Sequence, residues 1–345
     1  MAKIGETELK NRIKSGDFSP IYMLYGEESY LKEHYVSKLK SKTLDPAFAD
    51  FNFHQYDSNK VPFSDILNDA DMMPVMSSHS FLLVHDYPLN KSKDDIELLK
   101  KYCADPNESA IIVLWFDNIE VDTKKDSKWK NIESAVDKVG VCVDFEKRSE
   151  RDLARLAVAK AKKASCVLSS NDAMYLVSVV GNDIKTVFNE LDKMCCYVNG
   201  GEINREVIDL LAVKCLQARV FDLSKFILAG NSDGAYEVLR AMFAQKENPI
   251  SVLSVISSCY IDMYRAKCAL ASGEGEASLA KYFNYGNRKW LITNAVRDSK
   301  KLSLANLRDA IDVLSKTDEM LKSTSLNPNL LLEEAVTKLL MLRNG

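Results

Sequence analysis

The sequence predicts an α/β domain with a parallel sheet, followed by an all-helical region. In residues 1–146, short apolar runs alternate with segments whose apolar residues recur every three or four positions. That alternation is typical of a parallel sheet covered by helices on both faces. After residue 147 the strand-like runs disappear, and no proline occurs between Pro106 and Pro249. We therefore expect helices from there onward.

The α/β part is expected to begin with a buried strand and a tight turn. Residues 21–25 form an apolar run that Gly26 closes, and Leu31, Tyr35 and Leu39 then recur at the spacing of a helix. Further strands are predicted at 51–56, 80–84, 110–116 and 139–145, and further helices at 63–71, 92–104 and 126–138.

The helical part divides into two predicted domains. Helices over 149–164, 171–180, 183–198 and 204–212 would form a small domain at 147–212. Residues 213–345 would form a larger one, with helices at 219–229, 232–245, 249–271, 276–283, 287–298, 303–322 and 328–343. Asn248-Pro249 and Asn327-Pro328 are typical helix starts.

Composition and charge exclude several classes of protein. Of the 345 residues, 46% are hydrophobic, which is enough for packed cores, and the longest apolar run is seven residues, too short to cross a membrane. No apolar leader is evident at the start of the chain, so we expect a cytoplasmic protein without a membrane partner. The net charge is −3, distributed as −8 in residues 1–146, +1 in 147–212 and +4 in 213–345, which suggests different partners for the two ends.

The residues propose no catalytic or metal centre. The eight cysteines contain no C-x-x-C pair, and all four histidines precede the first cysteine, so we expect no metal site. A phosphate-binding loop needs a second glycine, yet bulky residues follow Gly26, and Glu27 and Glu28 stand where phosphate would lie. Asp86 has no second acid beside it and is expected to be a solvated strand-end residue, as is Asp117. We therefore expect no nucleotide cofactor and no catalytic residues.

The turn IYMLYGEESYLKEHY at residues 21–35 resembles the opening of the delta subunits of the bacterial DNA polymerase III clamp loader. Four later segments continue the resemblance in the same order, so it spans essentially the whole chain. They are VFNELDKM at 187–194, VFDL at 220–223, DEMLK at 318–322 and the leucine-rich stretch 330–340.

The resemblance implies a fold and a role in DNA replication. Residues 1–146 would be an AAA+-like domain without a working P-loop, 147–212 a small helical lid domain, and 213–345 a helical collar domain. The collar would join the delta prime and gamma or tau subunits in a five-subunit ring. The chain would bind and open the beta sliding clamp without hydrolysing ATP. It would belong to a DNA-directed DNA polymerase, a nucleotidyltransferase, while having no catalytic activity itself.

The resemblance also implies which residues would bind the clamp. The family's contact follows the pattern L-P-[LF]-F, and the corresponding positions are Met73, Pro74, Val75 and Met76, here called the wedge residues. Methionine replaces both large anchors and an aromatic ring is lost, so the partner clamp would need an altered pocket. In the alternative interpretation these side chains only plug the bottom of the domain.

A basic segment with interspersed aromatic residues is a candidate DNA surface. Residues 281–308 hold seven basic residues against one acid, Asp298. They are Lys281, Arg288, Lys289, Arg297, Lys300, Lys301 and Arg308. Contact with primer-template DNA is one interpretation and a solvated helix face is the other. A smaller cluster, Lys160, Lys162 and Lys163, leaves the same two open.

Two other classes of function remain open from the sequence. One is an active AAA+-type ATPase or remodelling enzyme with a non-standard nucleotide site, and saturable ATP binding would identify it. The other is an unrelated helical scaffold, in which charged substitutions at Val75 and Met76 would leave clamp binding unchanged.

Overall fold

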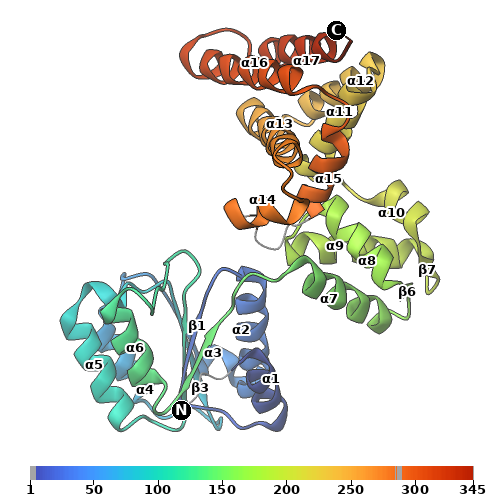
Figure 1. Ribbon diagram of the computed structural model, residues 1–345. Coiled ribbons are helices and arrows are strands. Elements are labelled where there is room, and N and C mark those ends of the chain that lie inside the picture. Colours follow the sequence, from blue (N-terminus) through green and yellow to red (C-terminus); the bar gives the residue numbers. More distant parts are fainter. Residues whose placement is uncertain (1–4, 284, 286–289, 345) are drawn as a thin grey trace. The chain divides into compact units, whose positions relative to one another are not determined.

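The computed structural model describes residues 5–283, 285 and 290–344 (Figure 1). The chain forms two compact units, Met1–Arg148 and Ser149–Gly345. The first is α/β and the second almost entirely helical, so the predicted fold class is confirmed. The further division at residue 212 stays a prediction.

The first unit contains a parallel sheet of five strands in the order β2-β3-β4-β1-β5. Their bounds are β1 (Ile21–Tyr25), β2 (Phe53–Asp57), β3 (Ser80–His85), β4 (Ala110–Trp115) and β5 (Val141–Asp144). The side chains of β1, and all of those of β3 and β4 except the last, are buried. Burial on both faces explains why these strands are continuous apolar runs.

Helices cover both faces of this sheet. Figure 1 shows α4 (Phe63–Ala70), α5 (Lys93–Ala104) and α6 (Ser127–Val136) on one face, and α1 (Glu6–Ser15) and α2 (Ser29–Thr43) on the other. Phe63 and Ile66 of α4 belong to the same buried cluster as Ile112 of β4. Two 3-10 turns, η1 (Pro46–Phe48) and η2 (Leu89–Lys91), and the one-turn helix α3 (Ala49–Asn52) complete the unit.

One strand begins later than the sequence predicts. Residues 51 and 52 lie in α3 rather than in β2. Asn52 is buried there, and its Nδ2 donates a hydrogen bond to the carbonyl of Phe48, 3.0 Å away. This closes a helical turn where the aromatic pattern indicates a strand.

The second unit consists of helices and one small parallel ladder of two strands. Its elements are α7 (Glu150–Lys163), β6 (Val167–Leu168), α8 (Ser170–Val180), α9 (Ile184–Val198), β7 (Glu202–Ile203), α10 (Arg205–Leu211), α11 (Leu216–Ala229), α12 (Ser232–Ala244), α13 (Pro249–Ala271), α14 (Glu276–Tyr282), α15 (Trp290–Ser299), α16 (Leu304–Ser323) and α17 (Pro328–Asn344). The predicted helix start at Asn248 is confirmed, because its Oδ1 accepts from the N–H groups of Ile250 and Ser251. A single buried cluster joins helices α11 to α17. Within the part of the chain that the structure describes, no helix has both the length and the apolar surface needed to cross a lipid bilayer.

Candidate functional site

The turn after β1 is shaped by the neighbouring strand. Gly26 has φ +107°, and a Cβ at this position would lie 2.6 Å from both Asp144 Oδ1 and the carbonyl oxygen of Phe145. The N–H of Glu28 donates to that same carbonyl, 2.9 Å away. Glycine is therefore required here by close packing on the segment after β5, independently of any ligand.

Lys32 has the position of a phosphate-loop lysine, six residues after Gly26, but its ammonium contacts the protein interior. The side chain is 1% exposed. Its Nζ donates to the carbonyl oxygens of Gly26 at 2.7 Å and Phe116 at 2.8 Å, and it pairs with Asp117 Oδ1 at 2.9 Å. An ammonium has three protons, so these partners use all of its donor capacity.

Asp86, at the end of β3, is not the solvated residue that the sequence predicts. It is only 7% exposed and accepts hydrogen bonds from the backbone N–H groups of Asp117 at 2.7 Å and Asn118 at 3.0 Å. Its other oxygen accepts from the Asn118 side chain at 2.7 Å. The loop after β4 turns back over the end of β3, and this supplies the donors that local sequence cannot reveal.

These contacts hold both carboxylates in the charged form. Burial would raise the pKa of Asp86, but the N–H donors of Asp117 and Asn118 outweigh it and hold that pKa below the ordinary value. Burial likewise opposes ionisation of Asp117, while Ser29 and Lys32 lower its pKa. Across the described ranges, no three His, Cys, Asp or Glu side chains gather as metal ligands would.

The wedge residues lie in the loop between α4 and β3, and their apolar side chains are on the surface. Met73 is 83% exposed, Met76 78% and Val75 47%, while Pro74 is partly buried. The alternative in which these side chains plug the domain does not describe this arrangement.

A residue that sequence reasoning missed holds the middle of this loop. The N–H of Val75 donates to Asn52 Oδ1 at 2.7 Å, and Asn52 Nδ2 donates to the carbonyl of Val75 at 2.9 Å. Asn52 lies 23 positions away in the sequence, so no local pattern could have revealed the contact.

The basic segment is only partly described, since Arg288 and Lys289 lie outside the described residues. Arg297 forms an ion pair with Asp298 at 2.9 Å, and Arg308 donates to the Tyr264 hydroxyl at 3.2 Å. Lys281, Lys300 and Lys301 are exposed. In the smaller cluster, Lys160 forms an ion pair with Asp192 at 2.7 Å, and Lys162 and Lys163 are exposed.

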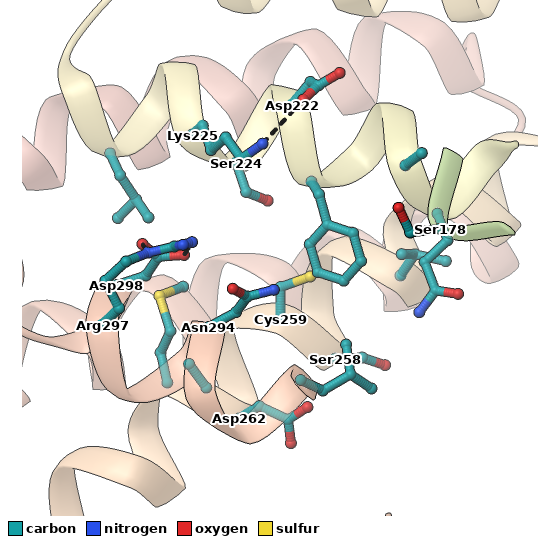
Figure 2. A pocket seen from close by; sticks show the side chains of 18 of the residues that line it. Ser178, Asp222, Ser224, Lys225, Ser258, Cys259, Asp262, Asn294, Arg297 and Asp298 are labelled. Atoms are coloured by element: carbon teal, nitrogen blue, oxygen red, sulfur yellow. Dashed lines mark hydrogen bonds and ion pairs between the residues drawn. The ribbon is translucent and has the colours of Figure 1, made fainter. Parts of the chain in front are cut away.

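The second unit contains a pocket of about 830 Å³ among α8, α11, α13 and α15 (Figure 2). Its acidic side chains are neutralised by neighbours: Asp222 by Lys214 and Lys225, Asp262 by Arg265, and Asp298 by Arg297. Figure 2 shows Asp222 joined to Lys225 at the rim. Because the three acids are already paired, they offer no uncompensated negative charge to select a cation.

The parallel sheet with this strand order, followed by an all-helical region, defines an AAA+-like protein. Comparison with known sequences is more specific. The family model described as "DNA polymerase III, delta subunit" matches residues 22–139, and the one described as "DNA polymerase III delta subunit, C-terminal domain" matches 217–339. Together they match most of the chain, which therefore belongs to the DNA polymerase III delta subunit family.

Individual relatives agree with this assignment. The chain is 24% identical to DNA polymerase III subunit delta of Bacillus subtilis over 95% of both chains. It is 20% identical to the probable DNA polymerase III subunit delta of Aquifex aeolicus over 86% of both. A solved structure of the Bacillus subtilis DNA clamp loader delta protein has the same fold, with a TM-score of 0.60 and 21% identity over 97% of this chain and 99% of that one. The resemblance read from the sequence is thereby confirmed at the level of the family of DNA polymerase III delta subunits.

Proposed function

We propose that this delta subunit binds the beta sliding clamp through the wedge residues and favours its open form, without hydrolysing ATP. The observation that carries the proposal is the exposure of Met73, Val75 and Met76 at the position of the family's clamp contact. Large apolar side chains on a loop fixed at its middle by two hydrogen bonds are suited to insertion into a pocket of a partner.

The opening of the clamp follows from differential affinity. A bound protein shifts an equilibrium only as far as it binds one state more tightly than the other. Side chains that anchor an interface by filling a pocket typically contribute about 2 kcal/mol or more each. If the pocket fits them better when the neighbouring clamp interface is relaxed, binding itself holds one gap open.

The internal contacts of the β1 turn support the absence of ATP hydrolysis. A phosphate would have to displace Lys32 from three protein oxygens and approach the buried Glu28. We expect the purified chain to show no saturable ATP binding at micromolar concentrations. Such binding would instead favour an AAA+-type ATPase or remodelling enzyme.

The rest of the chain would connect this subunit to the loader. Residues 147–212 and 213–345 would be the lid and collar domains. The collar would contact the delta prime and gamma or tau subunits of a five-subunit ring. The exposed lysines of 281–308 would face primer-template DNA, and the complex would act in the cytoplasm.

The test is capture of the sliding clamp of the same organism by the full chain. The variant Val75→Asp/Met76→Asp should stay folded and lose capture, because two carboxylates cannot enter an apolar pocket. The matched control is Leu326→Asp/Leu330→Asp, which adds the same charge at two exposed leucines of the second unit and should capture normally. Normal capture by the wedge variant would refute the proposal.

A further inference from the structure

The loop that carries the wedge residues lacks the usual source of rigidity. Loops are commonly fixed by burying some of their apolar side chains, but here Val75 and the three methionines at 72, 73 and 76 are all exposed. The loop is anchored at its two ends. Asn107 Nδ2 donates to the carbonyl of Ala70, 2.9 Å away, and the N–H of Ser80 donates to the carbonyl of Ser109 at 2.9 Å. Neither anchor reaches the exposed residues between them.

Asn52 supplies the missing central anchor. Its amide contacts both backbone groups of Val75, which is the pairing that a neighbouring strand would offer. The second hydrogen of its Nδ2 goes to Phe48, so every donor of the amide has a partner. The side chain is 1% exposed and cannot swing away without leaving those groups unpaired.

The backbone next to this anchor is strained. Met76 has φ +48°, in the left-handed region that a residue with a side chain adopts only at a cost. Such a conformation persists when the surroundings impose it, and the two hydrogen bonds to Val75 are the adjacent constraint. The strain places a large apolar side chain at the turn, where a glycine would be easier to accommodate.

From these contacts we infer that Asn52 is a positioning residue for clamp binding, which holds the wedge residues in the shape that enters the clamp. The inference rests on the proposed function. Fixing a loop before binding removes the entropy cost of ordering it in the complex. Without Asn52, the backbone at Val75 and Met76 would become ordered only on binding the clamp. The entropy cost of that ordering would then reduce the affinity for the clamp.

The test compares Asn52→Ala with wild type in two measurements on the full chain. We expect clamp affinity to fall about tenfold, since ordering one residue's backbone costs on the order of a factor of ten in binding. In the free variant, hydrogen exchange at the Val75 amide should accelerate, while amides of β3 and β4 keep their protection. A role confined to stability would lower protection throughout the unit.

The matched control is Ser92→Ala, which removes the N-cap side chain of α5. Ser92 follows the end of β3, whereas the wedge residues precede its start. It should destabilise the unit by a comparable amount and leave clamp affinity within twofold of wild type. If Asn52→Ala does not fold, Asn52→Leu has nearly the same shape and removes both the acceptor for the Val75 N–H and the donor to the Val75 carbonyl. It should then show the same two effects.

The two proposals can fail separately. Loss of capture by Val75→Asp/Met76→Asp together with wild-type affinity in the Asn52 variant would refute the positioning role alone. Normal capture by the wedge variant would refute the proposed function as well. A parallel loss of affinity in Ser92→Ala would also overturn the inference, because destabilisation alone would then explain the result.

Discussion

Replacing Lys32 with methionine should damage the fold rather than a nucleotide site. In a working phosphate loop, the lysine at this position contacts a ligand. Here the ammonium forms an ion pair with Asp117 and hydrogen bonds with the carbonyls of Gly26 and Phe116. Lys32→Met keeps the length of the side chain and removes only these contacts, so the carboxylate and the two carbonyls lose their donor.

The expected cost can be worked from the contacts. Breaking a buried ion pair by removing one partner typically costs about 3–5 kcal/mol. The side chain of Asp117 is 26% exposed, so water can partly replace the lost donor, and we expect about 3 kcal/mol. With a urea dependence of about 2 kcal/mol per molar, the unfolding midpoint of the first unit should fall by about 1.5 M.

Tryptophan fluorescence during urea unfolding can measure this change. Two of the three tryptophans, Trp115 and Trp129, lie in the first unit, so a Trp290→Phe background restricts the signal to it. The control is Lys100→Met, which breaks the exposed pair with Glu97 and should cost less than about 1 kcal/mol. A Lys32→Met protein as stable as this control would refute the structural role. ATP binding by wild type that Lys32→Met abolishes would do the same.

Two further predictions concern the ends of β3. Because donors hold the pKa of Asp86 below its unfolded value, its contribution to stability is present above about pH 4 and is lost as the pH falls through the folded pKa. Asp86→Asn should therefore lower stability at pH 7 by about 1–3 kcal/mol and flatten the loss of stability below pH 4, as followed by urea midpoints at several pH values. An unchanged acid limb would contradict this. Met76→Gly should relieve the backbone at φ +48° and leave stability equal or up to about 1 kcal/mol higher, yet weaken clamp capture because the anchor is gone. A variant that loses both together would contradict the separation of loop strain from fold stability.

The strands that the sequence predicts correctly are those whose own residues form a distinctive apolar pattern. β1, β3 and β4 are buried on both faces, so each is an apolar run that cannot be mistaken for a surface segment. The elements that the sequence does not predict have too weak a pattern of apolar residues. α1 buries only Leu9 and Ile13 among its charged residues, and the ladder of β6 and β7 has two residues in each strand.

The residues of the candidate site likewise differ in whether nearby sequence or distant partners determine their roles. The apolar stretch at residues 73–76 stands out between acidic and polar neighbours, but the residues alone leave open whether it is buried or exposed, and only the family resemblance favours the exposure that the structure has. The roles of Asn52 and Lys32 depend on groups 23 and 84 positions away, which only the folded chain brings close. The solvated role expected for Asp86 is wrong for the same reason, because its donors come from the loop after β4.

On the proposed function, Lys32 and Asn52 together explain how the unit would act without a nucleotide. In an ATPase of this class, the phosphate supplies charge at the β1 turn, and its loss can release neighbouring segments. Here the negative charge belongs to the chain itself, since Asp117 Oδ1 lies 2.9 Å from Lys32 Nζ, so on the proposed function the turn would stay fixed with or without a nucleotide. The wedge loop is fixed separately, by Asn52 at the other end of the sheet. On the proposed function, a loop held permanently in its binding shape can be regulated only by access. The partner subunits that bind ATP would then control the clamp contact by covering or uncovering the wedge residues, and not by reshaping them.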